Sequence, residues 1–181
     1  MYKGMNEASL HIGVINVSDR ASAGVYEDLP GREAETWLRE AVETPWTLEY
    51  AVIPDEETVI ADTLIEMVRK RGCCLILTTG GTGPAPRDVT PEATMRVCQR
   101  LLPGFGEAMR MESFKKIPTA ILSRQVAGLC DGCLVINLPG RPSAIRECLD
   151  VVAAAIPYAI FLASGRRLVY RPTRPPGYQP S

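Results

Sequence analysis

The stretch that decides the fold is Leu75–Thr94, which reads LILTTGGTGPAPRDVTPEAT. An apolar run ends in two threonines and passes directly into the glycine loop, residues 80–83 with the sequence GGTG. Beyond the loop, Thr90 precedes Pro91, and this pair is typical of a helix start with threonine as the N-cap. The stretch therefore predicts a buried strand, an exposed loop and a helix in succession.

The glycine loop has the composition of a phosphate-binding turn. Glycines let a ligand approach the backbone closely, and several N–H groups aimed into one concavity form an anion site. A Walker A loop is excluded because the loop contains no lysine. A dinucleotide fingerprint is also excluded, since Pro84 and Pro86 delay the helix. For an isolated GGTG, a tight turn without a ligand remains an alternative.

Apolar runs alternate with helical periodicity along the rest of the chain. Strands are predicted at residues 12–17, 46–53, 73–77, 120–122 and 133–138, and helices at 28–42, 59–68, 90 onward, 105–115 and 143–162. Pro157 is expected to kink the last helix or end it early. The alternation implies an α/β sandwich with a mostly parallel sheet. Ligands of such sheets bind at the carboxyl ends of the strands, where residues 18–24, 78–90 and 137–142 are expected to meet.

Length and composition limit the classes of protein. The 181 residues suggest one domain, residues 1–165, followed by a Pro/Arg-rich tail, 166–181, that is extended or disordered. A net charge of −1 gives no electrostatic footprint for nucleic acid or an anionic membrane. No secretory layout and no apolar run near the ~20 residues of a membrane span is seen. We therefore expect a cytoplasmic protein with reduced cysteines.

The histidine and cysteine residues do not form a pattern typical of catalysis or of a complete metal site. The one histidine, His11, stands at the start of the first strand, away from the ligand edge, which argues against a Ser-His-Asp hydrolase. Cys130 and Cys133 form a C-x-x-C, but a structural zinc site needs four ligands and no second pair is evident. Cys73 and Cys74 are adjacent in a strand and are expected to pack into opposite faces of the core.

Several motifs in order resemble one family. The sequence from residue 12 to about 162 resembles the molybdopterin adenylyltransferase (MogA/MoaB) family of molybdenum cofactor biosynthesis proteins. The motifs that carry this resemblance are VSDRASAGVYEDLPG near the start, IPDE at 53–56, TTGGTGPAPRDVTPEAT at 78–94, PGFGEAMRMESF at 103–114, TAILSRQVAG at 119–128 and NLPGRPSAIRECL at 137–149. After Leu149 the chain runs directly to VVAAAIPYAIFLASG, whereas some members of the family carry an insertion there.

The resemblance implies a three-layer α/β/α fold, usually assembled as a homotrimer. It implies transfer of AMP from Mg-ATP to the terminal phosphate of molybdopterin, with release of pyrophosphate and hand-over of the product to a molybdenum-insertion protein. The chemistry suits a chain with one histidine. A phosphate monoester is already largely ionised at neutral pH, and phosphoryl-type transfer depends mainly on positioning and charge neutralisation.

The resemblance also implies the site residues. Asp55 and Asp88 match the two functional aspartates, expected to act in catalysis and to hold Mg²⁺; otherwise Asp55 reads as a helix cap, and Asp88 as a turn cap or a partner of Arg87. Ser113, Ser123 and Arg124 match positions on the molybdopterin side. The full set expected to bind nucleotide or molybdopterin is Ser18, Asp19, Arg20, Gly80, Gly81, Thr82, Gly83, Arg87, Thr90, Ser113, Ser123, Arg124, Asn137, Pro139 and Gly140.

Two other functions stay open at this point. The chain could be a binding or carrier module that holds molybdopterin without transferring AMP efficiently. It could also be a nucleotide hydrolase, like the related domain of competence-damage proteins, which would release products from a nucleotide without any pterin.

Overall fold

The computed structural model describes residues 9–173. Within this range six strands form one sheet in the order β2-β1-β3-β6-β5-β4. The strands are β1 (Leu10–Val17), β2 (Trp46–Ile53), β3 (Cys73–Thr79), β4 (Arg100–Leu101), β5 (Ala127–Cys130) and β6 (Cys133–Leu138). The α-helices are α1 (Asp19–Ser22), α2 (Leu29–Ala41), α3 (Glu57–Arg69), α4 (Thr90–Val97), α5 (Pro103–Phe114), α6 (Pro142–Val152) and α7 (Ile156–Ser164), and two 3₁₀ helices are η1 (Pro118–Leu122) and η2 (Ala153–Ala155).

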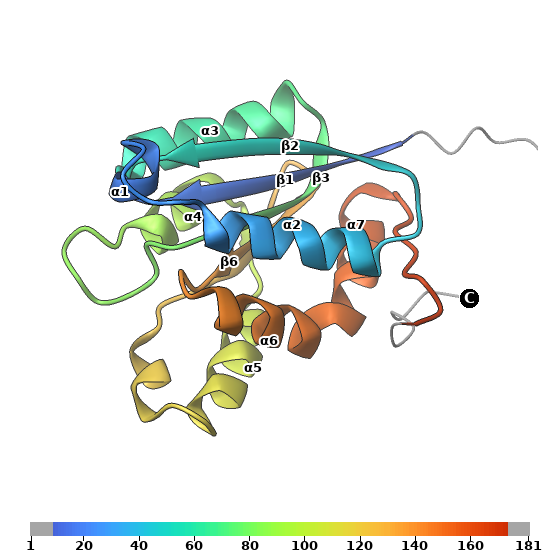
Figure 1. The fold of residues 1–181 in the computed structure, drawn as a ribbon. Helices are drawn as coiled ribbons and strands as arrows, with labels where there is room; N and C mark the ends of the chain where they lie inside the picture. The colour runs from blue at the N-terminus through green and yellow to red at the C-terminus, as the bar shows by residue number, and fades with distance from the viewer. Residues whose placement is uncertain (1–8, 174–181) are drawn as a thin grey trace, which may run out of the picture.

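The sheet is mostly parallel, as predicted. β2, β1, β3 and β6 run in one direction, and β5 is antiparallel to β6. The chain moves outward from β1 to β2 and then returns to the other side of β1 as β3. The strand order thus reverses between β1 and β3, and this is where open α/β sheets form their ligand crevice. Figure 1 shows the arrowheads of β1 and β2 at one edge, where α1 and the green loop after β3 also lie.

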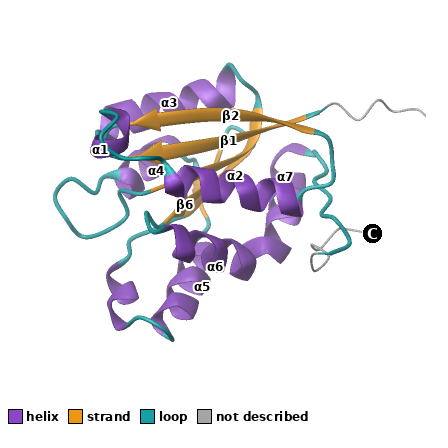
Figure 2. Cartoon of the chain, in the orientation of Figure 1, coloured by secondary structure: helices purple, strands orange, loops and turns teal. Residues whose placement is uncertain are grey.

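Helices cover both faces of the sheet and confirm the three-layer architecture (Figure 2). Buried residues of α2, α5, α6 and α7 form one core cluster, and those of α3 and α4 form a second. Cys74 belongs to the first cluster and Cys73 to the second, so the prediction of opposite faces is confirmed. β3 is buried along its whole length, as expected for a parallel strand covered on both faces.

Two predicted elements differ in the structure. Residues 120–122 do not form a strand but belong to η1, which Pro118 begins. The predicted long helix at residues 143–162 is interrupted by η2, and Pro157 lies in the first turn of α7, where its missing N–H costs no helical hydrogen bond. The interruption therefore precedes the proline rather than coinciding with it.

The C-x-x-C motif is a β-hairpin. Cys130 and Cys133 pair across β5 and β6, and Asp131 and Gly132 form the turn with φ of 46° and 85°. Positive φ at both central residues is the type I′ geometry that Asp-Gly favours. Both thiols are fully buried, and burial raises the pKa of Cys133 and of Cys130. Protonated core thiols are poor metal ligands, and among the described residues no cluster of three or more His, Cys, Asp or Glu suits a metal ion.

The first residues of the predicted tail are packed on the domain. Leu168 is fully buried, and the hydroxyl of Tyr170 donates a hydrogen bond to the Ala153 carbonyl at 2.9 Å. Tyr170 also forms an isolated antiparallel bridge with Val42. The packed part of the chain therefore extends past the predicted boundary at residue 165, while residues 174–181 lie outside the described range.

One stretch, Pro142–Ser164, is long and apolar enough to cross a membrane by length and composition, contrary to the expectation from the sequence. In the fold it is divided into α6, η2 and α7, and 39% of its most apolar window is buried inside the protein. α6 packs on α2 and α5, and α7 packs on β6. The apolar side chains on the inward-facing side of this stretch therefore form part of the hydrophobic core.

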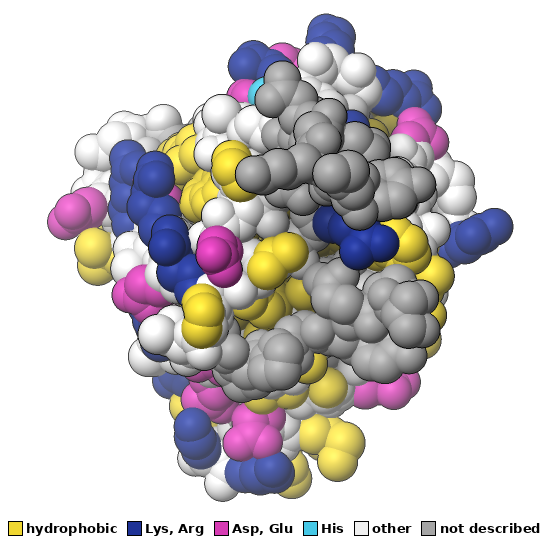
Figure 3. Space-filling view, turned by 90° about the vertical axis from the view of Figure 1, so that its right-hand side faces the viewer, with side chains coloured by type: hydrophobic (Ala, Val, Ile, Leu, Met, Phe, Trp, Pro, Cys, Tyr) yellow, Lys and Arg dark blue, Asp and Glu magenta, His cyan; other side chains and the backbone are white. Residues whose placement is uncertain are grey.

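The end of the molecule opposite the ligand edge carries charges of both signs (Figure 3). Lys and Arg are interspersed with Asp and Glu and with hydrophobic side chains on this face.

We predict that Leu168→Ala lowers the free energy of unfolding by about 2–5 kcal/mol, because it empties a fully buried site. Val169→Ala is the matched control, since the neighbouring side chain is 46% exposed and should change stability by less than about 0.5 kcal/mol. Urea denaturation measures both. If Leu168→Ala changed the free energy of unfolding as little as Val169→Ala does, residues 166–173 would not belong to the unit that unfolds cooperatively.

Candidate functional site

The glycine loop is held from within by its own chain. The N–H of Gly80 donates to the Leu138 carbonyl at 3.2 Å, and the hydroxyl of Thr90 donates to the Gly80 carbonyl at 3.0 Å. Gly80 and Gly81 have φ of 87° and 63°, a region that favours glycine. The predicted N-cap role of Thr90 is wrong: Val89 occupies the cap, and the Thr90 side chain fastens the loop instead.

Three amides of the loop remain unengaged. None of the described residues accepts a hydrogen bond from the N–H of Gly81, Thr82 or Gly83. The carbonyls of the loop, by contrast, have partners, because Gly81 accepts from the Thr90 N–H at 3.1 Å and Thr82 accepts from the Arg124 N–H at 2.8 Å. The loop therefore offers N–H donors while its own carbonyls are already engaged, as an anion site requires.

Arg124 braces the loop, and its expected role on the molybdopterin side stays a prediction. Its Nε donates to the Gly83 carbonyl at 2.8 Å, and its Nη2 donates to the Asp88 carbonyl. Its guanidinium also pairs with Glu92 on α4 and holds the pKa of that carboxyl below its usual range. One planar fork thus ties Gly83, at the end of the glycine loop, and Asp88 to the helix that follows.

Three aspartates gather beside the loop. The N–H of Asp19 donates to Asp55 Oδ2 at 2.8 Å, and the N–H of Asp55 donates to Asp19 Oδ1 at 3.0 Å. A Cβ added to Gly81 would lie 3.1 Å from Asp55 Oδ1, and one added to Gly83 would lie 2.7 Å from Asp88 Oδ2. Both predicted functional carboxylates therefore lie directly against the glycine loop. The alternative of Asp55 as a helix cap is wrong, since Glu56 is the N-cap of α3.

The charges of these carboxylates are unequal. Hydrogen bonds from Arg87, at 2.8 Å to each oxygen of Asp19, hold the pKa of Asp19 below its usual range. Burial raises the pKa of Asp55, and the like charges of Asp19 and Asp88 raise it further. Asp88 caps its own turn by accepting from the Ala85 N–H at 3.0 Å, and Arg87 pairs with Asp19 rather than with Asp88.

The carboxylates suit a hard divalent cation. None of the described residues donates a hydrogen bond to Asp55 Oδ1 or Asp88 Oδ1, and the raised pKa of Asp55 reflects burial and a repulsion that a cation would relieve. Two carboxylate oxygens are too few for a complete protein cage. They are what Mg²⁺ uses when phosphates and water supply its remaining ligands.

The first cavity, about 450 Å³, lies at the carboxyl end of β1. Its wall includes the predicted residues Ser18, Arg20, Gly80 and Gly140. Ser18 also caps α1, because its hydroxyl accepts from the Ala21 N–H at 3.2 Å. The volume lies in the range typical of small-ligand pockets.

The second cavity, about 260 Å³, lies on the other side of Gly140. It brings together the predicted residues Ser113, Ser123, Pro139 and Gly140. Arg110 and Gln125 also line it, and the Arg110 guanidinium is fixed by the Gln125 carbonyl at 2.9 Å. The two cavities meet at Gly140, whose added Cβ would lie 3.4 Å from the Gly80 Cα.

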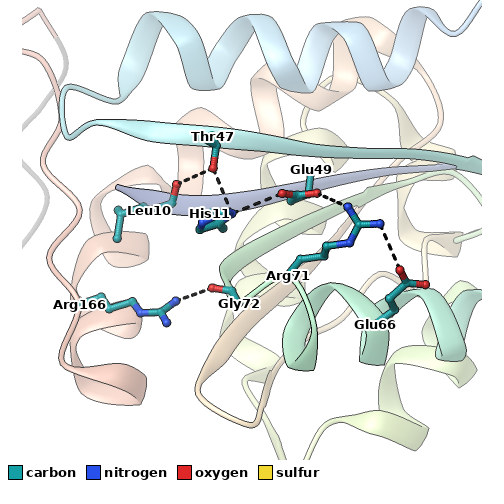
Figure 4. A network of polar contacts seen from close by, with 8 residues as sticks. All are labelled: Leu10, His11, Thr47, Glu49, Glu66, Arg71, Gly72 and Arg166. Atoms are coloured by element: carbon teal, nitrogen blue, oxygen red, sulfur yellow. Dashed lines mark hydrogen bonds and ion pairs between the residues drawn. The ribbon is translucent and has the colours of Figure 1, made fainter. Parts of the chain in front are cut away.

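Two polar residues are held by contacts within the protein. Asn137 is fully buried, and its amide group donates to the hydroxyls of Thr78 and Thr94 at 2.9 and 2.8 Å, so its expected ligand contact stays a prediction. His11 lies at the opposite end of β1, where its Nδ1 is 3.1 Å from the Thr47 hydroxyl and 3.4 Å from Glu49 (Figure 4). His11 is therefore too far from the glycine loop to serve as a base there.

Sequence reasoning missed a buried polar network behind the first cavity. Asp28, the N-cap of α2, accepts from the Gly31 N–H at 2.8 Å and from Asn16 Nδ2 at 2.7 Å, and the Tyr50 hydroxyl also donates to it. Asn16 in turn accepts from the Thr79 hydroxyl at 3.1 Å. Burial and the bond to Asp28 raise the pKa of Tyr50. The sequence DLPG, residues 28–31, is typical of a capped helix start. Only the fold shows that the network around Asp28 connects three strands through Asn16, Tyr50 and Thr79.

We predict that Gly81→Ala destabilises the protein more than Gly24→Ala does. Both glycines have positive φ, 63° and 72°, and the alanine strain there is about 1–2 kcal/mol. A Cβ at Gly81 would also lie 2.3 Å from the Thr90 hydroxyl, whereas nothing lies within 4 Å at Gly24. Urea denaturation should show about 1–3 kcal/mol more for Gly81→Ala. If both substitutions lowered the free energy of unfolding equally, Gly81 would not be packed against the Thr90 hydroxyl in this way.

We predict that Asp55→Asn stabilises the metal-free protein at neutral pH and not at acid pH. The folded pKa of Asp55 is raised above its ordinary 3.8, so ionisation opposes folding once the pH exceeds 3.8. The stability that Asp55→Asn gains over wild type should therefore appear as the pH rises from 3.8. It should become constant above the folded pKa of Asp55. Urea midpoints between about pH 3 and 8, with exposed Asp62→Asn as control, measure it. A variant less stable than wild type at neutral pH would contradict the cause assigned to the shift.

Comparisons with known proteins agree with this geometry. Residues 13–158 match the MoCF_biosynth family, described as "Probable molybdopterin binding domain". The molybdopterin adenylyltransferase of Helicobacter pylori (strain J99) is 55% identical over 157 residues, covering 87% of this chain and 89% of that protein. The Escherichia coli (strain K12) molybdopterin adenylyltransferase is 48% identical over 169 residues, covering 87% of each. The crystal structure of the molybdopterin biosynthesis enzyme MoaB from Thermus thermophilus aligns with a TM-score of 0.80 and 38% identity, over 87% of this chain and 98% of that one.

The matched range, residues 13–158, includes the glycine loop, the three aspartates beside it and the residues that line both cavities. The chain belongs to the MoCF_biosynth family of molybdopterin-binding domains.

Proposed function

We propose that this protein is a molybdopterin adenylyltransferase, which transfers AMP from Mg-ATP to the terminal phosphate of molybdopterin and releases pyrophosphate. The observation that carries the proposal is the set of three unengaged amides, at Gly81, Thr82 and Gly83, with two carboxylates against the same loop. Relatives that the chain matches over nearly nine-tenths of its length are named for this activity.

The two cavities suit two substrates. The first cavity borders Gly80 and is assigned to the nucleotide, and the second, with Ser113, Ser123 and Arg110, to molybdopterin. Their junction at Gly140 lies against Gly80, the first residue of the glycine loop, so we place the phosphates of both substrates beside this residue. Positioning two phosphates in one concavity converts a bimolecular reaction into a nearly unimolecular one.

The residues of the site perform this chemistry without a proton shuttle. An ionised oxygen of the molybdopterin phosphate attacks the α-phosphorus of ATP, a new P–O–P bond forms, and the bond to the β-phosphate breaks with its electron pair leaving on pyrophosphate. The nucleophile is already deprotonated, because the second pKa of a phosphate monoester is ~6. The loop amides stabilise the negative charge that develops at the α-phosphate, as an oxyanion hole does. The adenylylated product is then passed to a metal-insertion protein.

Mg²⁺ is assigned to the free oxygens of Asp55 and Asp88. When bound, it would neutralise phosphate charge and polarise the transferred group. Arg87, which pairs with Asp19 at the rim, supplies a further cation within reach of the same carboxylates, since its charge also affects the pKa of Asp55.

A carrier module of the same fold is the weaker candidate. Relatives that match 87% of this chain are named molybdopterin adenylyltransferases, which favours the transfer reaction over binding alone.

We predict that the purified protein, given molybdopterin, ATP and Mg²⁺, releases one pyrophosphate per adenylylated product. Asp55→Asn should lower kcat at least about a hundredfold, since it removes half of the proposed metal ligands while keeping the side-chain shape. Asp62→Asn on the exposed face of α3 is the control. If wild type binds molybdopterin and releases no pyrophosphate, the protein is a carrier. If it releases products from ATP without pterin, it is a hydrolase.

We further propose that the protein assembles as a homotrimer. An apolar groove of about 490 Å³ between α5 and α7, lined by Leu102, Phe105, Tyr158 and Leu162, supports a self-association surface. Leu162 is 65% exposed in the single chain. Apolar surface of this kind is typical of permanent interfaces.

Light scattering should therefore give three times the chain mass of 19.8 kDa. Leu162→Arg should shift the mass toward that of one chain, because it places a charge in the groove, while Arg32→Ala, an exposed change on α2, should leave it unchanged. A monomeric wild type at micromolar concentration would contradict the proposal.

A further inference from the structure

Tyr26 is a large aromatic side chain that the proposed phosphate chemistry leaves unexplained. It is 60% exposed, yet it lines the first cavity. The guanidinium carbon of Arg20, another residue of the same wall, lies over its ring, 5.3 Å from the centroid. An exposed aromatic ring next to a cation at the mouth of a cavity is a ready surface for a flat ligand.

The chain around Tyr26 is ordered by its own hydrogen bonds. The N–H of Val25 donates to the Arg20 carbonyl at 2.9 Å, and the N–H of Gly24 donates to the Ala21 carbonyl at 3.0 Å. Gly24 adopts the left-handed φ of 72° that closes this turn. Ser18 caps the helical turn from which it starts. Tyr26 is therefore presented by a closed turn anchored at the end of β1.

The adjoining walls suit the edges and faces of a heteroaromatic base. Leu29 and Pro30, at the start of α2, and Pro142, at the start of α6, line the same cavity. Its volume of about 450 Å³ is within the range of sites that hold small ligands. Aromatic and apolar walls with a few polar groups are typical of such sites.

We propose that Tyr26, together with Arg20, is the stacking platform for the adenine base of the nucleotide. The inference rests on the proposed adenylyl transfer. The base and not the pterin is assigned here because this cavity opens directly onto Gly80 of the glycine loop, whereas Ser113, Ser123 and Arg110 line the cavity beyond Gly140. When the adenine base stacks on Tyr26, the phosphates of the nucleotide extend toward the loop amides.

The test compares Tyr26→Ala, Tyr26→Phe and Val25→Ala. Tyr26→Ala should raise the KM for ATP about tenfold, the usual effect of removing a base-stacking ring, with little change in kcat or in the KM for molybdopterin. Tyr26→Phe keeps the ring and should restore the affinity lost in Tyr26→Ala. Val25→Ala removes a neighbouring side chain that is 69% exposed and lies outside the cavity wall, so it is the matched control.

Binding of a non-hydrolysable ATP analogue with Mg²⁺, followed by calorimetry, gives a second readout that needs no turnover. An affinity about tenfold weaker in Tyr26→Ala supports the platform even if wild type releases no pyrophosphate, in which case only the proposed function fails. An unchanged nucleotide affinity in Tyr26→Ala overturns the inference while leaving adenylyl transfer intact. A rise confined to the KM for molybdopterin overturns it too, because the ring would then stack on the pterin.

Discussion

The structure depends on how the backbone of the glycine loop is fastened. Its inward groups are bonded to the protein: the Gly80 N–H to Leu138, the Gly80 carbonyl to the Thr90 hydroxyl, and the Gly83 carbonyl to Arg124. The next three N–H groups are left without partners among the described residues. A fixed loop with unengaged donors needs little reorganisation when a phosphate arrives, which is the condition for strong electrostatic stabilisation. The reversal of strand order between β1 and β3 places this loop where a ligand can reach it.

The charges around the glycine loop lower the stability of the ligand-free protein. Asp55 is kept partly buried beside Asp19 and Asp88, and its pKa is raised by burial and by both neighbours. Asp19 is compensated by Arg87, which lies on the loop segment that follows. The free protein thus carries a partly buried acidic site whose repulsion a divalent cation would relieve. This explains how one chain can catalyse transfer between phosphates while its single histidine lies at the far end of β1.

Much of the fold could be predicted from the sequence, because buried parallel strands are short apolar runs and the helices between them carry clear stripes. The strand predicted at residues 120–122 failed because an apolar triplet after Pro118 is equally compatible with a 3₁₀ turn. The β5–β6 hairpin could not be predicted readily, because β5 is only four residues long and the Asp131-Gly132 turn lies inside a C-x-x-C pattern. In the site, motif residues adjacent to a strand end were placed correctly at the ligand edge. The roles of Thr90 and Arg124 could not be predicted, since both act on backbone carbonyls that are distant in sequence.

The most direct measurement is the ¹⁵N–¹H spectrum of the loop amides during titration with Mg²⁺ and a non-hydrolysable ATP analogue. Gly165 is the internal control, because its N–H is bonded to Phe161 in α7 and it lines neither cavity. We predict downfield shifts and slowed hydrogen exchange at Gly81, Thr82 and Gly83, with no change at Gly165. Saturating nucleotide that leaves those three amides unshifted, or shifts Gly165 as much as them, would contradict the proposed phosphate site.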